Sequence, residues 1–340
     1  METGNLGTAG SAATRDACAP SERDYQTLMA GAGYRVLEER VVVRVTGDDR
    51  AAFLHGMCSN DIKNLQPGSV LYALFLTERA HLISDFYAWA RYDAILIEAD
   101  RKLWPPTRAH LEKLIVADDV EMKDLDGMAV IDVEGPAAGE AVAAAVPAGV
   151  SNQVTELRPW HWAEVGTLIV GRVMRFGPLG FTILADKGKT AEITGQLAGA
   201  IEVSTAALET MRIENGIARV GADATEHTIA LEARLEPALS FSKGCYLGQE
   251  TIERATARGG IKRRLFGLRI QGTRVPEPGA AVYDTAGKQV GGLTSAAHSP
   301  RLGVLGLSIL HHSAWKPGAE MEVKDSAGIV KAVVSELPFK

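Results

Sequence analysis

The C-terminal part of the chain differs in pattern from everything before it, and this difference constrains the fold more than any other feature. After Gly259 and Gly260, short runs of β-branched and apolar residues alternate with Gly and Pro turns. Such a series is typical of a small β-barrel or β-sandwich. The runs are LFGLRI, AAVYD, KQVGGLTSA, VLGLSIL, AEMEVKD and IVKAVVSEL. We therefore predict a separate β-barrel domain over residues 262–340.

Residues 25–258 mix strand and helix patterns without a regular strand–helix–strand alternation. VVVRV predicts a strand, and DDRAAFLHGMCSNDI predicts an Asp-capped helix whose apolar side, including Cys58, faces a core. VLYALFLT, LISDFYAWARY and AILIEA predict a hairpin or meander, followed by a helix over 104–117. MAVIDVEGPAAGEAVAAAV predicts a strand and an Ala-rich helix, and GTLIVGRVMRF predicts a further strand. This mixture indicates an α+β fold rather than a doubly wound sheet.

Length and charge narrow the class of protein. The chain has 340 residues, which is long for one core and predicts two or three domains. A net charge of -6 argues against a dedicated nucleic-acid-binding protein, although a local basic patch runs from Arg254 to Arg264. Residues 1–24 are rich in Gly, Ala, Ser and Thr, so we predict a flexible tail rather than a signal peptide.

The cysteines and the apolar runs bear on the compartment. Cys18, Cys58 and Cys245 are an odd number at wide spacing, without the spacing of a zinc site. They predict neither a disulfide framework nor a resident metal. This cysteine usage predicts a reducing compartment, hence a cytoplasmic protein. Because no apolar run reaches the roughly 18 residues that a membrane span needs, we also predict no membrane partner.

The octet KGCYLGQE, residues 243–250, contains the most reactive type of side chain in an unusual setting. The following residues, QETIERATARGG, predict a short helix, so Cys245 lies just ahead of a helix N-terminus. Amide dipoles there, together with Lys243, would stabilise a thiolate that acts as a nucleophile or metal ligand. The alternative is a small buried cysteine in a tight glycine turn. The residues alone leave both interpretations open.

Two further stretches carry candidate binding groups. On a strand, Asp85, Tyr87 and Trp89 share one face, so a carboxylate and two rings could line a pocket for a flat heteroaromatic ligand. The alternative is an edge-strand Asp beside half-buried aromatics. The basic patch could hold phosphate, RNA or a polycarboxylate, or it could be a solvated linker.

Several motifs together resemble a known family. KGCYLGQE, preceded by MRIENGIARVGAD and followed by RGGIKRRLFGL, resembles the YgfZ family of folate-binding proteins. That family is similar to the T-protein, the aminomethyltransferase of the glycine cleavage system. The resemblance implies a three-lobed GcvT/YgfZ-like cloverleaf, with two interleaved α+β subdomains and a C-terminal β-barrel around a central channel for tetrahydrofolate.

The resemblance also implies site residues. Asp85 falls on the acidic position near the reactive folate nitrogens, Trp89 on a folate-contacting aromatic, and Arg212 on an arginine close to the folate. The octet adds further members to the folate-binding set, namely Lys243, Tyr246 and Gln249. Asp85 and Cys245 are the predicted catalytic residues.

Departures from the transferase pattern separate the two branches. RFGPLGFT stands where the transferases have GYTGEDGFE, so Arg175 replaces a tyrosine and Thr182 replaces the glutamate expected to grip the pteridine. Cys245 stands where the transferases have an acid. These differences favour the YgfZ type over glycine cleavage.

The functional hypothesis follows from that resemblance. We expect a tetrahydrofolate-binding protein that supports assembly, repair or maintenance of iron-sulfur clusters in client enzymes. Cys245 would be the functional thiol and at most a transient iron ligand, because a cluster usually needs four protein ligands. The alternative is a folate-dependent one-carbon transferase, an aminomethyltransferase or demethylase, in which Asp85 assists proton transfer. A third hypothesis is a scaffold with a vestigial pocket.

Overall fold

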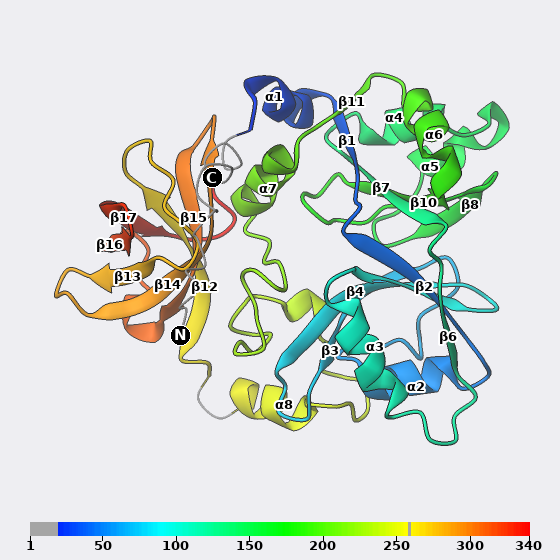
Figure 1. Cartoon of the computed structure of the whole chain (residues 1–340), viewed down its shortest axis with the longest axis horizontal. Helices are drawn as coiled ribbons and strands as arrows, with labels where there is room; N and C mark the ends of the chain where they lie inside the picture. The colour runs from blue at the N-terminus through cyan, green and yellow to red at the C-terminus, as the bar shows by residue number, and fades with distance from the viewer. Residues whose placement is uncertain (1–19, 258–259) are drawn as a thin grey trace, which may run out of the picture.

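Two open β-sheets and one closed β-barrel form the framework of the residues that the structure describes, 20–257 and 260–340 (Figure 1). The structure is a computed structural model. The two open sheets occupy one side of the molecule and the barrel the other, with helix α7 between them. The α+β cloverleaf with a C-terminal barrel, predicted from the sequence, is therefore confirmed.

The five-stranded sheet is antiparallel, in the order β3-β4-β5-β2-β6. Helices α2 (Arg50–Met57) and α3 (Trp104–Glu112) cover one face. The predicted meander appears as three consecutive neighbouring strands, while α3 ends earlier than predicted. The strands are β2 (Arg40–Thr46), β3 (Val70–Leu76), β4 (Leu82–Ala90), β5 (Ile95–Asp100) and β6 (Glu121–Asp124).

The six-stranded sheet has the order β11-β1-β7-β10-β9-β8, with only the β1–β11 pair parallel. Its outer face packs against α4 (Ala138–Ala144), α5 (Ser151–Thr155) and α6 (Thr190–Gln196). The chain enters this sheet with β1, leaves it for β2 to β6, and returns with β7, so the two lobes are interleaved. The strands are β1 (Ala32–Val36), β7 (Met128–Glu134), β8 (Trp162–Val165), β9 (Leu168–Gly171), β10 (Phe181–Asp186) and β11 (Ala200–Glu202).

Six strands close into the barrel, in the order β12-β15-β14-β13-β16-β17. Alternate residues of each strand fill its interior, including Leu268, Val282 and Val323. Each of the six runs named from the sequence supplies one strand. They are β12 (Arg263–Ile270), β13 (Ala281–Asp284), β14 (Gln289–Ser299), β15 (Gly303–His311), β16 (Glu320–Asp325) and β17 (Gly328–Ser335).

The remaining helices connect these parts. Helix α1 (Glu22–Ala30) is capped by Ser21, α7 (Thr205–Glu214) is capped by Ser204, and α8 is Gln249–Ala257. In the described ranges, no helix combines the length and apolarity needed to cross a membrane. Short 3-10 turns occupy Ala148–Val150, Lys187–Lys189, Glu236–Ala238 and His312–Ala314.

Some local predictions need correction or stay open. Asp49 precedes α2 but its side chain does not cap the helix; it accepts a bond from the Asp119 amide instead. The strand predicted for GTLIVGRVMRF ends at Gly171, and an irregular loop follows. Most of the predicted tail lies outside the described residues, while residues 22–24 belong to α1. The three domain boundaries remain predictions.

The two open sheets pack face to face, and this contact positions the candidate site. On β4, even-numbered Phe86 and Ala88 face α2 and α3, whereas odd-numbered Tyr87 and Trp89 face the six-stranded sheet. The contact is apolar around Trp89 and Val130. Farther along the same strands, the facing residues are polar.

Candidate functional site

The polar half of the contact between the sheets is the candidate site, and we call it the intersheet polar cluster. Both sheets contribute, because neighbouring strands place these residues on facing surfaces. One member, Arg175, comes from the irregular loop between β9 and β10. The cluster consists of Arg40 on β2, Tyr72 on β3, Asp85 and Tyr87 on β4, Glu98 on β5, Asp132 and Glu134 on β7, Arg175, and Thr182 on β10.

Glu98 is the centre of the charge network. Its Oε1 lies 2.7 Å from Arg40 Nε, and Nη2 of Arg175 lies 2.9 and 2.8 Å from its two carboxylate oxygens. Burial raises the pKa of Glu98, but Arg175 and Arg40 outweigh burial and hold the pKa below its ordinary value. Glu98 is therefore ionised at neutral pH, between two buried cations.

The ring of Tyr87 contacts both arginines of the cluster and Tyr72. The Arg175 guanidinium carbon lies 4.5 Å from the Tyr87 ring centroid, and that of Arg40 lies 5.8 Å away. Tyr72 lies 5.0 Å from Tyr87, ring centre to ring centre. Such distances are those of cation–π and aromatic contacts. A flat, positively polarised group is therefore the kind of partner that this surface accepts.

Two carboxyl groups on β7 are incompletely paired. Asp132 Oδ1 accepts bonds from Thr182 Oγ1 at 2.8 Å and Arg175 Nε at 3.4 Å, and Glu134 Oε1 accepts from the Phe176 amide at 3.2 Å. Asp132 Oδ2 and Glu134 Oε2 have no hydrogen-bond partner among the described residues. Burial raises the pKa of Asp132 to about 6, and burial together with the Asp132 charge raises that of Glu134 well above its ordinary value.

Asp85 is the half-buried carboxyl group of the cluster. Its Oδ2 accepts a bond from the Tyr72 hydroxyl at 3.0 Å. Burial raises the pKa of Asp85, although Arg40 and the Tyr72 bond act in the opposite direction. Asp85 can therefore exchange a proton closer to neutral pH than a solvated aspartate.

These groups fit the chemistry of a folate ring. Carboxylates accept bonds from ring N–H groups, and tyrosine rings stack on a flat heterocycle. The predicted face of Asp85, Tyr87 and Trp89 is present. Trp89, however, is 0% exposed and lies against Gly171 in the apolar half. Its side chain is part of the packing beneath the cluster.

Arg212 lies in a separate network between α7 and the barrel. Its Nη1 is 2.7 Å from Asp223 Oδ2, its Nη2 is 2.9 Å from Ser295 Oγ, and it also pairs with Glu209. It is 2% exposed. Arg212 therefore joins elements, with its guanidinium already engaged by protein groups.

Lys243 of the octet caps the C-terminal end of α2. Its ammonium donates to the backbone carbonyls of His55, Cys58 at 2.8 Å and Asn60 at 3.0 Å. A cation at a helix C-terminus compensates the unpaired carbonyls and the helix dipole. The Lys243 charge thus serves α2, a role that the octet alone did not suggest.

Cys245 is exposed, and the octet around it is firmly anchored. Gly248 has φ +86°, and a Cβ atom there would lie 2.7 Å from the Thr77 carbonyl oxygen. Tyr246 is buried in a core cluster, and Gln249 Oε1 accepts from the Tyr246 amide at 3.2 Å at the start of α8. The octet thus presents the thiol to solvent from a fixed turn.

Part of the basic patch is paired with acidic side chains. Arg258 lies outside the described residues. The other three arginines each form an ion pair with a glutamate that precedes them in the chain, so part of the positive charge is already paired. The pairs are Arg254 with Glu250, Arg263 with Glu232 at 2.9 Å and Arg264 with Glu236 at 3.2 Å.

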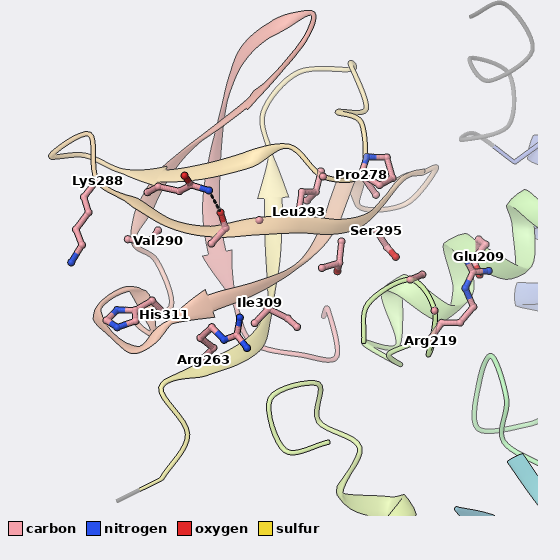
Figure 2. A pocket seen from close by; sticks show the side chains of 18 residues that line it. Glu209, Arg219, Arg263, Pro278, Lys288, Val290, Leu293, Ser295, Ile309 and His311 are labelled. Atoms are coloured by element: carbon pink, nitrogen blue, oxygen red, sulfur yellow. Dashed lines mark hydrogen bonds and ion pairs between the residues drawn. The ribbon is translucent and has the colours of Figure 1, made fainter. Parts of the chain in front are cut away.

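An open groove of about 1000 Å³ runs along the barrel (Figure 2). Its lining includes Arg263 of the basic patch but no member of the intersheet polar cluster. Lys288 and His311 lie toward one end, and Arg219 and Glu209 toward the other. Arg219 is already paired with Glu209 at 2.8 Å, and Arg263 is paired as well. The groove therefore offers less specific chemistry than the intersheet polar cluster, in spite of its size.

Several cluster members were not predicted from the sequence. Glu98, Asp132 and Glu134 are acids inside the apolar runs AILIEAD and MAVIDVE. A charged residue on a buried strand is rarely unpaired, so these acids were a usable signal. Arg40 gave no comparable signal.

Comparisons with known proteins agree with this architecture. The family model described as the GCVT N-terminal domain matches residues 15–243, and the glycine cleavage T-protein C-terminal barrel domain matches residues 263–340. A chloroplastic Arabidopsis thaliana protein that carries a transferase name is 31% identical over 303 residues, covering 87% of this chain and 68% of the relative. An aminomethyltransferase of Nostoc sp. is 27% identical, covering 93% and 87%.

A solved structure gives the same fold. The glycine cleavage system aminomethyltransferase T from Bartonella henselae superposes with a TM-score of 0.84 at 22% identity, over 94% of this chain and 89% of that chain. Together, the two family models cover nearly all of the described chain. The chain therefore belongs to the glycine cleavage T-protein family.

Proposed function

We propose that this protein binds a reduced folate, tetrahydrofolate, at the intersheet polar cluster. The proposal is supported by membership of a family whose relatives include aminomethyltransferases. The observation that carries it is the half-buried Asp85, which joins Tyr72 and Tyr87 on one face of the contact between the sheets. A carboxyl group with a raised pKa can hold or release a proton beside an amine nitrogen.

Asp85→Asn should weaken tetrahydrofolate binding about tenfold or more, because the amide cannot accept a charge-assisted bond on both oxygens. The amide keeps the size of the carboxyl group and can still accept from Tyr72. Anaerobic isothermal titration calorimetry measures the change. Asp93→Asn is the matched control, since Asp93 is exposed and pairs with Arg44 outside the cluster. Equal affinities for the Asp85 variant and wild type would remove Asp85 from the site.

Within the family, we propose a YgfZ-type role in iron-sulfur cluster maintenance, with Cys245 as the working thiol. The exposure of Cys245 on a fixed turn supports it, since a partner protein can reach the sulfur. In the described ranges, no three His, Cys, Asp or Glu side chains gather as a metal site. Any iron bound by Cys245 is therefore shared with a partner or held transiently.

Cys245 should be the alkylated thiol in Cys18→Ser protein treated with iodoacetamide. Cys58 should stay unmodified, because it is buried and burial raises its pKa to about 11. Mass spectrometry of the labelled peptides measures the result. In cells that lack the protein, Cys18→Ser should restore iron-sulfur enzyme activity and Cys245→Ser should not. Full rescue by Cys245→Ser would refute the thiol role.

Folate-dependent one-carbon transfer is the second candidate function. The aminomethyltransferase relatives favour it. Incubation with tetrahydrofolate and aminomethyl or methyl donors distinguishes the two. Catalytic formation of methylene- or methyl-tetrahydrofolate supports transfer, whereas binding without turnover supports the maintenance role. The absence of any folate binding would leave the scaffold hypothesis.

A further inference from the structure

Arg175 occupies the place between the sheets where the cluster is best suited to a flat ligand. Its guanidinium lies 4.5 Å above the Tyr87 ring, and its nitrogens contact the carboxyl groups of Glu98 and Asp132. The guanidinium is planar and carries N–H donors around a central N–C–N unit. The guanidinium thus stacks on the Tyr87 ring and pairs with two carboxyl groups at the same time.

The same environment suits a heterocycle with a guanidine-like edge. A 2-amino-4-oxopyrimidine ring has the same N–C–N unit, is flat, and donates N–H bonds. Two oxygens have no hydrogen-bond partner within residues 20–257 and 260–340, namely Asp132 Oδ2 and Glu134 Oε2. They are further acceptors that the Arg175 side chain does not use. Buried acceptors without a donor are costly, so a ligand that supplies more donors would gain from them.

We infer that Arg175 is an internal mimic of the ligand, and that a 2-amino-4-oxopyrimidine ring binds between the sheets by displacing its guanidinium from Tyr87, Glu98 and Asp132. This inference rests on the proposed folate binding and names the part of the folate that the cluster recognises. The ring would stack on Tyr87 and donate to the carboxyl groups of β7.

The charges that Arg175 leaves behind do not prevent its displacement. Glu98 keeps its 2.7 Å pair with Arg40. Asp132 and Glu134 have raised pKa values, so both can stay neutral when no cation is near. Each buried carboxyl group thus has an alternative to the lost contact.

The backbone that carries Arg175 lies outside the hydrogen-bonded strands of the sheet. Arg175 belongs to the irregular segment between β9 and β10, in which Leu179 is exposed. The segment is tied at the next residue, where the Phe176 amide donates to Glu134 and its carbonyl accepts from Asn215 at 3.1 Å. Arg175 can therefore rotate out while Phe176 stays anchored.

A side chain that occupies the ligand position, which we call a plug, lowers the apparent affinity of the protein for its ligand. Only the fraction of molecules in which Arg175 is displaced can bind. Arg175→Ala should therefore bind tetrahydrofolate roughly tenfold more tightly than wild type, and Arg175→Lys should show a smaller gain. The lysine keeps a positive charge beside Glu98 but lacks the planar group over Tyr87. The same ranking is expected for 6-methyltetrahydropterin, which has the ring without the glutamate tail.

Arg172→Ala is the matched control. Arg172 lies on the same loop, but its side chain donates to the Leu157 carbonyl and lies over Phe181, outside the cluster. The affinity of Arg172→Ala for tetrahydrofolate should stay within about twofold of the wild-type affinity. With RT at about 0.59 kcal/mol, this is a change in binding free energy of less than about 0.5 kcal/mol. Circular dichroism confirms that each variant is folded.

The outcomes separate this inference from the proposed function. If wild type binds tetrahydrofolate and folded Arg175→Ala and Arg175→Lys bind equally or more weakly, Arg175 is not a plug and the inference fails alone. If no protein binds tetrahydrofolate, the proposed function and the inference both fail. If Arg175→Ala binds tetrahydrofolate but not 6-methyltetrahydropterin, the ring is not the recognised part and the inference fails.

Discussion

Glu98→Gln should lower the free energy of unfolding by about 3–5 kcal/mol, the cost of removing one partner from a buried ion pair. Glu98 is 0% exposed and is the shared counter-ion of Arg40 and Arg175. The amide leaves the Arg40 guanidinium without its carboxylate partner and leaves Arg175 with only the longer 3.4 Å contact to Asp132. It also turns its own NH2 group toward one of the two guanidinium groups. Urea unfolding at pH 7, followed by circular dichroism, measures the loss.

Glu121→Gln is the control for this change. Glu121 belongs to β6 of the same sheet and is exposed, so the substitution should alter stability by no more than about 0.5 kcal/mol. A Glu98→Gln loss as small as that of the control would show that the buried pairs contribute little.

The loss in Glu98→Gln should also depend on pH. Because Arg175 and Arg40 hold the Glu98 pKa below its ordinary value of 4.5, the carboxylate contributes stability above that value. The contribution is lost as pH falls through the folded-state pKa. The difference between wild type and variant should therefore shrink below pH 4.5 and stay constant from pH 6 to 8. A difference that grows in acid would contradict this assignment of charge.

The architecture was predictable where local pattern determines burial. In the barrel, the alternation in a run such as AEMEVKD places Met321 and Val323 inside and exposes the residues between them, so the pattern predicts the strand. The face shared by Asp85, Tyr87 and Trp89 followed from strand geometry alone. Which sheet would face these residues did not follow, because β7 joins the site only after the chain has completed the five-stranded sheet.

The contacts of the cluster were not predictable, because they join distant positions. Arg175 contacts Glu98, which lies 77 residues away in the sequence, and Asp132, which lies 43 residues away. Lys243 shows most clearly that closeness in sequence does not predict which groups a side chain contacts. In sequence it is two positions from Cys245, yet its ammonium reaches carbonyls more than 180 residues earlier. A long side chain makes sequence proximity a poor guide to its charge.

Arg212→Met should also lower the free energy of unfolding by about 3–5 kcal/mol, because it removes one partner of a buried ion pair. This ion pair belongs to the network between α7 and the barrel, not to the intersheet polar cluster. The buried Asp223 keeps bonds from hydroxyl groups, including that of Ser295, but loses its cation 2.7 Å away. Arg219→Met is the control, since Arg219 also pairs with Glu209 but is 51% exposed and should cost at most about 1 kcal/mol. Thermal unfolding of both variants measures the difference. If both variants lose the same stability, burial does not strengthen the Arg212 ion pair. If Arg212→Met loses much more than Arg219→Met, Arg212 stabilises the contact between α7 and the barrel.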